Sequence, residues 1–203
     1  MTIDDIMRVS PVIPVLVLEG EADWTKLAET FVEAGLRVLE VTLRTAVALD
    51  AIRAMAKVPG AIVGAGTVLN ERQLGDAVDA GSRFIVSPGL TEPLAKAVMQ
   101  SGVAYLPGVA TAADIMRGMD LGLDRFKFFP AETSGGVAAL KALSAPFGQA
   151  RFCPTGGIRP DTAAGWLAVP SVLCVGGTWF YRGVEDNFET VAERARAAAA
   201  LRI

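Results

Sequence analysis

RFKFFP, at Arg125–Pro130, is the stretch from which the fold of this chain can be worked out. It predicts a short buried strand that carries one lysine, Lys127, among three phenylalanines and ends at a proline. An apolar environment disfavours a charged ammonium and favours the neutral amine, the nucleophile that Schiff-base chemistry requires. Of the five lysines in the chain, only this one interrupts an apolar strand. The alternative is a lysine that extends to the rim of a sheet and has no chemical role.

On both sides of this stretch, short apolar runs rich in β-branched residues alternate with amphipathic segments. The runs begin about every 20–25 residues, the spacing of a strand followed by a crossover helix. We therefore predict an α/β fold, a single-domain (β/α)₈ TIM barrel over residues 1–203 with a short helix at Thr2–Val9 before it. A doubly wound open sheet is the alternative, because periodicity alone does not show whether a sheet closes. The predicted strands are Val12–Leu18, Leu36–Leu43, Ala61–Ala65, Arg83–Ser87, Val103–Pro107, Arg125–Phe129, Ala150–Pro154 and Ser171–Val175.

The amphipathic segments predict helices, and many of these units end at a glycine. Glycine just past the last turn is a common helix stop, because it adopts the left-handed conformation without strain. An alanine-rich segment at about residues 186–201 predicts a last helix on the outside of the sheet. The other segments are Asp23–Ala34, Ala46–Lys57, Asn70–Ala80, Glu92–Gln100 and Ala112–Met119, and the glycines are Gly35, Gly60, Gly81, Gly102 and Gly122.

The composition, 52% hydrophobic and 20% charged residues, is that of a globular protein with buried strands. The formal net charge is −3 and no basic run is present, so we expect no nucleic-acid partner. The sequence MTIDDIM at the start is acidic and no apolar run approaches membrane-spanning length, so we expect a cytoplasmic protein without a membrane partner. Cys153 and Cys174 fall inside predicted strands and are expected to be reduced core residues; a cystine between neighbouring strands is the alternative.

The chain contains no histidine. This excludes Ser-His-Asp and Cys-His catalysis and the usual histidine ligand sets of zinc and non-haem iron. If the protein is an enzyme, carboxylates, lysine or water must carry the acid–base chemistry, and we expect no metal.

Polar residues gather at the C-terminal ends of the predicted strands, where active sites of this fold lie. Glu40 and Arg44 share one parity of the second strand, and Lys127 faces the same interior from the sixth. Glu40 can shuttle protons beside a Schiff-base lysine, or it is a structural ion-pair partner. Arg44 has a fork suited to a carboxylate, or it is a plain surface arginine. Thr67 and Thr155 complete the set from two further strand ends.

Glycine pairs follow the last two predicted strands, in Thr155-Gly156-Gly157 and Gly176-Gly177-Thr178. Backbone amides without side chains in front of them form anion sites, and the loops after strands seven and eight are the usual phosphate position in a barrel. One pair alone is usually just a turn, so the two together carry the prediction. The stretch GAGT at Gly64–Thr67 lacks the third glycine of a dinucleotide fingerprint, so no nucleotide cofactor is expected.

With these residues in place, the chain resembles the 2-keto-3-deoxy-6-phosphogluconate (KDPG) aldolases, many of which also cleave 4-hydroxy-2-oxoglutarate. The matching segments run in order through nearly the whole chain, and EVTLRT together with KFFPAE is highly specific. The segments are SPVIPVLVL at Ser10–Leu18, EVTLRT at Glu40–Thr45, GAGTVL at Gly64–Leu69, FIVSPGLT at Phe84–Thr91, LPGVATAAD at Leu106–Asp114, RFKFFPAE at Arg125–Glu132 and PTGGI at Pro154–Ile158.

The resemblance implies a class I aldolase that uses Lys127 as the Schiff-base residue and Glu40 as the acid–base group. It implies cleavage of a phosphorylated 2-keto-3-deoxy sugar acid to pyruvate without a cofactor, in the Entner–Doudoroff pathway, by a homotrimer. Thr178 departs from the serine that the family often has after the last glycine pair. The implied substrate-binding residues are Arg44, Thr67, Pro88, Phe129 and Thr155, and the implied phosphate-binding residues are Gly156, Gly157, Gly176, Gly177 and Thr178.

Three alternatives remain open at the level of sequence. The first is a preference for the galactonate epimer of the substrate. The second is a phosphosugar isomerase or epimerase in which Lys127 is a plain cation, and the third is a non-catalytic barrel that binds a phosphorylated metabolite.

Overall fold

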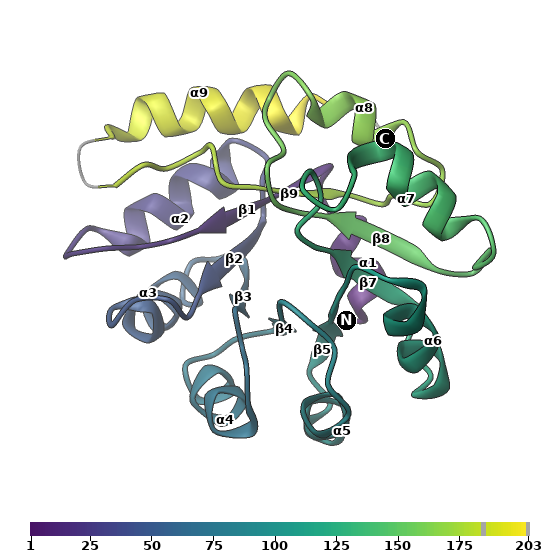
Figure 1. Ribbon diagram of the computed structural model, residues 1–203. Coiled ribbons are helices and arrows are strands. Elements are labelled where there is room, and N and C mark those ends of the chain that lie inside the picture. The colour runs from purple at the N-terminus through teal and green to yellow at the C-terminus, as the bar shows by residue number, and fades with distance from the viewer. Residues whose placement is uncertain (184–185, 202–203) are drawn as a thin grey trace.

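Parallel strands lie at the centre of the protein and curl around a common interior, while helices surround them on the outside (Figure 1). The computed structural model describes residues 1–183 and 186–201. Strands and helices alternate along the chain, so the predicted α/β class is confirmed. The strands are β1 (Val12–Leu16), β2 (Val38–Thr42), β3 (Ile62–Gly66), β4 (Phe84–Val86), β5 (Ala104–Leu106), β6 (Gly108–Val109), β7 (Arg125–Phe128), β8 (Arg151–Pro154) and β9 (Val175–Gly177).

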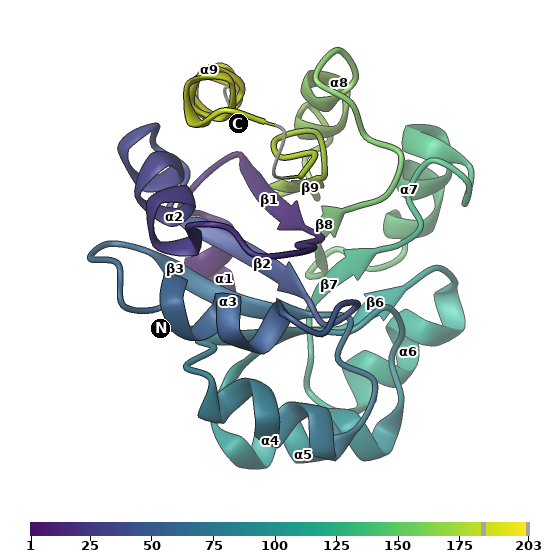
Figure 2. The same cartoon turned by 90° about the vertical axis from the view of Figure 1, so that its left-hand side faces the viewer.

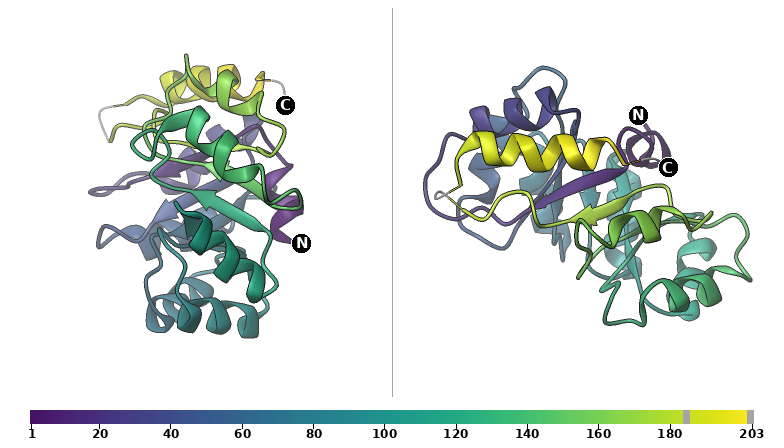
Figure 3. Two further views of the ribbon diagram at one scale, coloured as in Figure 1. Left: turned by 45° about the vertical axis from the view of Figure 1, so that its right-hand side comes forward. Right: turned by 90° about the horizontal axis from the view of Figure 1, so that it is seen from above.

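The helices are α1 (Ile3–Met7), α2 (Trp24–Glu33), α3 (Ala48–Met55), α4 (Glu71–Asp79), α5 (Glu92–Ser101), α6 (Ala112–Asp120), α7 (Gly136–Ser144), α8 (Ala163–Leu167) and α9 (Phe188–Ala199). Figure 2 shows α2 and α3 along the outside of β1 and β2, and Figure 3 shows α9 beside α2. All five glycines predicted to end a helix have φ angles between 74° and 99°. Four of them lie just past the ends of α2, α4, α5 and α6, which confirms the prediction there, whereas α3 ends at Met55 and Gly60 lies in a later turn. Among the helices in the described ranges, none has the length and apolar character needed to cross a membrane.

Hydrogen bonding divides the strands into two parallel sheets. One has the order β5-β4-β3-β2-β1-β9, and the other has the order β6-β7-β8. Pro107 alone separates β5 from β6 along the chain, and the ladder is interrupted there because proline has no N–H to donate. Two isolated parallel bridges, Phe152–Val172 and Thr155–Gly176, join β8 to the segment that contains β9. The result is a curled parallel array whose strands all end on the same side.

Two apolar clusters lie on opposite faces of this array. The larger cluster fills the space between strands and helices and includes Phe126 and Phe128 of β7. The smaller cluster lies in the interior and includes Val38 of β2 and Ile6 of α1. Because successive side chains of a strand point to opposite faces, Lys127 points into the interior between the two outward-facing phenylalanines.

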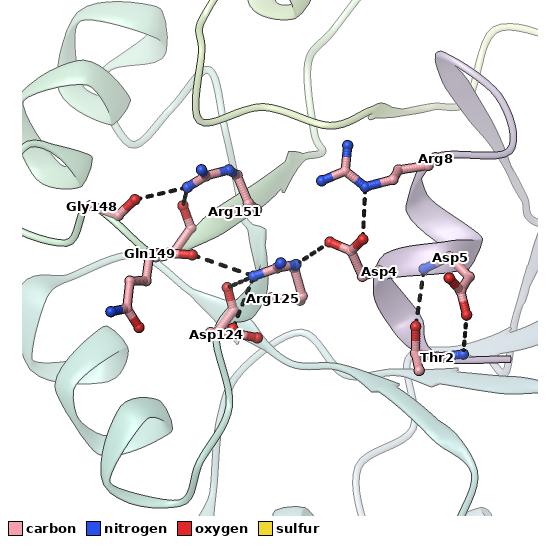
Figure 4. A network of polar contacts seen from close by, with 10 residues as sticks. Thr2, Asp4, Asp5, Arg8, Asp124, Arg125, Gly148, Gln149 and Arg151 are labelled. Carbon is pink, nitrogen blue, oxygen red and sulfur yellow. Dashed lines mark hydrogen bonds and ion pairs between the residues drawn. The ribbon is translucent and has the colours of Figure 1, made fainter.

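Helix α1 covers the N-terminal end of the interior and is fixed there by ion pairs (Figure 4). The Nε atom of Arg125, the first residue of β7, donates to Asp4 at 2.5 Å. Arg8 Nε donates to the other oxygen of the same carboxylate at 2.7 Å. Thr2 begins the helix in a capping box with Asp5. The predicted N-terminal helix is confirmed, in a form shorter than the expected Thr2–Val9.

The prediction of the last strand is wrong by several residues. The expected strand is Ser171–Val175, whereas β9 consists of Val175–Gly177 and pairs with β1. A Cβ atom on Gly176 would collide with Thr155 Oγ1, and one on Gly177 would collide with the ring of Trp179. These glycines are needed because neighbouring side chains approach the strand closely. An apolar run in the sequence carries no trace of such contacts, so both glycines were predicted to lie in a loop.

Candidate active site

One ion pair crosses the interior of the curled array. Lys127 Nζ donates a hydrogen bond of 2.9 Å to Glu40 Oε1. The two residues belong to β7 and β2, which are in different sheets, and their side chains are only 7% and 4% exposed. Attraction between buried charges often fails to offset the loss of their hydration, so such a pair is weak evidence for stability. A chemical role is the better explanation for two charged groups in this position.

An aromatic ring lies beside this ion pair. Lys127 Nζ is 5.3 Å from the centroid of the Phe129 ring. The same ring lies close to Gly156, where a Cβ atom would come within 3.3 Å of it. The face of an aromatic ring attracts a cation, so Phe129 stabilises positive charge on the lysine nitrogen. The ring therefore connects the lysine with the first glycine pair.

A glycine of β3 makes room for the Glu40 carboxylate. A Cβ atom on Gly66 would collide with Glu40 Oε1 and would lie 2.7 Å from its Cγ. Gly66 is in register with Thr42, two residues beyond Glu40 on β2, so the glutamate side chain leans toward the C-terminal end of the strands. Gly66 was not among the predicted site residues. The available signal was the presence of two glycines, Gly64 and Gly66, at the end of an apolar run, since glycine in a strand often marks the close approach of another group.

Arg44 and Thr67 lie together at the ends of β2 and β3. Arg44 Nε donates to Thr67 Oγ1 at 3.2 Å, and the arginine side chain is exposed. Thr67 has a φ of 59°, in the left-handed region that a β-branched residue rarely adopts. Strain of this kind persists where the surrounding structure demands it, and it is frequent at ligand sites. The remaining donors of the Arg44 fork are therefore held at the open end of the interior.

The two glycine pairs lie side by side, because Thr155 and Gly176 form a parallel bridge. Gly156 and Gly157 have φ angles of 102° and 80°, in the left-handed region that glycine adopts without strain. In residues 1–183 and 186–201 neither of these two N–H groups donates to a protein acceptor. Thr155 is buried, with its hydroxyl 3.4 Å from the carbonyl oxygen of Cys153. The arrangement leaves amide donors available for an anion.

The outer residues of the predicted site lie at the same end of the strands. Thr178 is exposed directly after β9. Pro88 is half-buried after β4, and its carbonyl group lies against Gly108, the residue in register with Lys127. Most residues of the predicted set lie at or just beyond the C-terminal ends of strands, whereas Glu40 and Gly176 are the middle residues of β2 and β9. The structure brings together Lys127 with Glu40 and Arg44 with Thr67.

Both cysteines belong to the interior cluster, and Cys153 is in register with Lys127. Cys153 and Cys174 are free and buried, as predicted for core residues. Contact with Cys153 and then burial raise the pKa of the Cys174 thiol well above its ordinary value. A thiol of this kind stays protonated and unreactive.

Known proteins resemble this chain from end to end. A family model described as "Aldolase: KDPG and KHG aldolase" matches residues 3–193. A 2-dehydro-3-deoxy-phosphogluconate aldolase of Zymomonas mobilis is 54% identical over 200 residues, which cover 98% of this chain and 96% of the relative. A crystal structure of the Zymomonas mobilis 2-keto-3-deoxy-6-phospho-gluconate aldolase has a TM-score of 0.97 at 54% identity, with 100% and 98% of the two chains covered.

One solved relative contains a reaction intermediate. This relative is KDPG aldolase from Legionella pneumophila, and its crystal structure holds pyruvate captured at low pH as a covalent carbinolamine intermediate. Its TM-score to this chain is 0.94 at 40% identity, and the match covers 98% of this chain and 99% of that one.

Proposed function

We propose that this chain, which belongs to the KDPG and KHG aldolase family, is a class I aldolase that acts through a Schiff base on Lys127. It cleaves 2-dehydro-3-deoxy-6-phosphogluconate to pyruvate and glyceraldehyde 3-phosphate. Its second substrate is 4-hydroxy-2-oxoglutarate, which gives pyruvate and glyoxylate. The observation that carries the proposal is the buried contact of 2.9 Å between Lys127 Nζ and Glu40 Oε1. The relatives named as KDPG aldolases and the pyruvate carbinolamine of one of them support it.

The first step is attack of the Lys127 amine on the C2 ketone of the substrate. Only the neutral amine is a nucleophile, and Glu40 Oε1 already accepts a hydrogen bond from this nitrogen, so an acceptor for the departing proton is in place. The carbinolamine then loses water and becomes a protonated imine. In the structure the centroid of the Phe129 ring is 5.3 Å from Lys127 Nζ. The ring therefore stabilises the positive charge that the imine carries on this nitrogen.

The protonated imine accepts the electron pair of the C3–C4 bond when that bond breaks. Glu40, directly or through a water molecule, takes the proton of the C4 hydroxyl as glyceraldehyde 3-phosphate forms. The product on the enzyme is an enamine, which Glu40 then protonates at C3. Hydrolysis of the resulting imine releases pyruvate and restores the lysine.

The ends of the substrate are held by the remaining residues of the site. Arg44 and Thr67 bind the carboxylate, since a guanidinium forms charge-assisted hydrogen bonds with carboxylate oxygens. Pro88 and Thr155 contact the substrate between its carboxylate and the carbon that is bound to Lys127. The phosphate is bound by the amides of Gly156, Gly157, Gly176 and Gly177, with the hydroxyl of Thr178 as a further donor.

We also propose that the two sheets form one closed (β/α)₈ barrel in a single domain over residues 1–203, of which 184–185 and 202–203 lie outside the described residues. The single-residue gap at Pro107 and the bridge between Thr155 and Gly176 support closure. In this proposal the protein assembles as a homotrimer and acts in the Entner–Doudoroff pathway. It also includes a cytoplasmic location, which two free cysteines support because reducing compartments keep thiols free.

A coupled assay of pyruvate release tests this function on KDPG, on its galactonate epimer and on 4-hydroxy-2-oxoglutarate. We expect the highest kcat/KM with KDPG. A higher value with the galactonate epimer would identify the other branch of substrates. Proton exchange without carbon–carbon cleavage would identify an isomerase, and absence of pyruvate release with tight ligand binding would identify a non-catalytic barrel.

A further inference from the structure

Glu132, four residues before α7, fills the space next to the first glycine pair. A Cβ atom on Gly157 would lie 2.7 Å from both Cβ and Cγ of Glu132. Gly157 has a φ of 80°, so glycine is required there for its backbone conformation as well as for space. The aliphatic stem of the glutamate therefore forms the wall against which this glycine packs.

The carboxylate of Glu132 is held by a helix outside the proposed reaction site. The indole Nε1 of Trp166, in α8, donates to Glu132 Oε1 at 3.0 Å. Trp166 is 1% exposed and packs against Phe128 of β7, with ring centroids 6.2 Å apart. Because this tryptophan is fixed in the core, its N–H is a rigid anchor for an otherwise exposed glutamate. A hydrogen bond to a charged group is also stronger than one between neutral groups.

The main chain completes the connection between these two segments. Glu132 N–H donates to Gly156 C=O at 3.0 Å, and Ala131 N–H donates to Thr155 C=O at 2.8 Å. The segment after β7 thus runs beside the glycine pair after β8 and holds it through its carbonyl groups. The N–H groups of Gly156 and Gly157 take no part in these bonds.

The direction of the Glu132 carboxylate also matters electrostatically. A carboxylate turned toward the amides would repel a bound anion, and it would compete with that anion for the donors. The bond to Trp166 directs Oε1 toward α8, while Oε2 lies beside Gly136, the first residue of α7. A helix N-terminus favours negative charge, so this position stabilises the carboxylate away from the glycine pair.

We propose that Glu132 and Trp166 are a positioning pair that preorganises the amides of Gly156 and Gly157 for the phosphate group of the substrate. Neither residue touches the reacting carbon atoms. The inference rests on the phosphate site of the proposed function and adds the two residues that hold it in shape. Glycine has more conformational freedom than any other residue, so donors on a glycine pair need external support to be rigid before the ligand binds.

The test separates the phosphate end of the substrate from its keto-acid end. In Glu132→Ala and Trp166→Phe we expect KM for KDPG to rise roughly tenfold, with kcat within about twofold of wild type. The rate at which borohydride traps pyruvate on the protein should not change, because pyruvate has no phosphate. Glu132→Gln retains an acceptor for the indole N–H, so its KM should return to within about threefold of wild type. The double variant should be no worse than either single variant, because the two residues act through one bond.

Glu193→Ala, on the exposed face of α9, and Trp24→Phe, at the start of α2, are matched controls for loss of a glutamate and of a tryptophan. Equal losses in KDPG turnover and in pyruvate trapping would overturn the positioning role, and so would an unchanged KM or a failure of Glu132→Gln to restore it. If wild type traps no pyruvate, the proposed function fails instead. Titration with inorganic phosphate then still tests the pair: weaker binding to Glu132→Ala and Trp166→Phe supports it, and equal binding overturns it.

Discussion

Strand β7 carries two cations, two residues apart, and each forms an ion pair with a carboxylate from another element. At its N-terminal end Arg125 bonds to Asp4 of α1 at 2.5 Å, with side chains that are 18% and 31% exposed (Figure 4). Further along, Lys127 bonds to Glu40 at 2.9 Å, with side chains that are 7% and 4% exposed. The geometry of the two contacts is similar, whereas the burial and the chemistry of the two cations differ.

The difference separates a structural clamp from a reactive group. Arg125 also donates to the carbonyl oxygens of Asp124 and Gln149, so its fork is occupied by fixed partners. A guanidinium does not lose its proton in proteins, whereas the neutral form of a lysine side chain is a nucleophile. The Asp4–Arg125 pair therefore docks α1 over the interior, whereas in the proposed function the Glu40–Lys127 pair holds the amine that attacks the substrate ketone.

Exchange of the two cations should give the largest contrast. Lys127→Arg retains the positive charge but has no neutral amine, so we expect pyruvate release from KDPG to fall by at least about 10⁴-fold. Arg125→Lys retains a cation opposite Asp4 and should remain within about threefold of wild type. Steady-state kinetics on both variants, with circular dichroism to verify folding, checks this. Comparable losses in the two variants would refute the division of roles.

Replacement of the two carboxylates should give the next largest contrast. Glu40→Gln should lower kcat by roughly 10²–10⁴-fold, the usual contribution of general acid–base catalysis, while some imine formation survives. Asp4→Asn should leave kcat unchanged, because its carboxylate contacts α1 and β7 at the far end of the strand. Near-normal turnover in Glu40→Gln would remove this residue from the mechanism.

Stability should show a smaller difference between the two pairs. Lys127→Met leaves Glu40 buried without its partner and should lower the free energy of unfolding by about 3–5 kcal/mol at pH 7. The Asp4–Arg125 pair is partly exposed, so Asp4→Asn should lower it by about 1 kcal/mol or less. Urea denaturation measures both. An equal cost for the two substitutions would mean that burial does not distinguish the pairs.

The smallest expected effect is the pH dependence of the stability that the Asp4–Arg125 pair contributes. The hydrogen bond from Arg8 lowers the pKa of Asp4 below its usual 3.8, burial opposes this, and the bond from Arg125 adds to it. Because the folded-state pKa is depressed, the contribution of Asp4 to stability is complete above about pH 4 and is lost as the pH falls through the folded-state pKa. The difference in unfolding free energy between wild type and Asp4→Asn should therefore shrink below about pH 4. A difference that stays constant down to pH 2 would contradict the role of the Asp4 carboxylate.

The Glu40–Lys127 pair was predictable from sequence, and the Asp4–Arg125 pair was not. Lys127 and Glu40 each lie between apolar residues of a predicted strand, and strand parity places both in the same interior. Arg125 lies 121 positions from Asp4 along the chain, and nothing in the local sequence of either residue indicates the other. The N-terminal helix could be predicted, but its docking site depends on the closure of the interior.

Residues defined by space were the hardest to predict. Gly66 and Gly176 lack side chains because Glu40 and Thr155 occupy the places where Cβ atoms would lie. Such contacts join separate strands and leave no periodic signal. The same holds for the bond between Trp166 and Glu132, since these residues meet only after both chain segments have folded onto the array.

The central claim is that Lys127, and not its neighbouring cation, forms the imine. It is tested most directly by treating wild type and Arg125→Lys with pyruvate and borohydride and locating the reduced adduct by peptide mass spectrometry. We predict an adduct on Lys127 in both proteins and none on the lysine introduced at position 125. An unlabelled Lys127 in the folded wild type, or equal labelling at the two positions of the variant, would contradict the account.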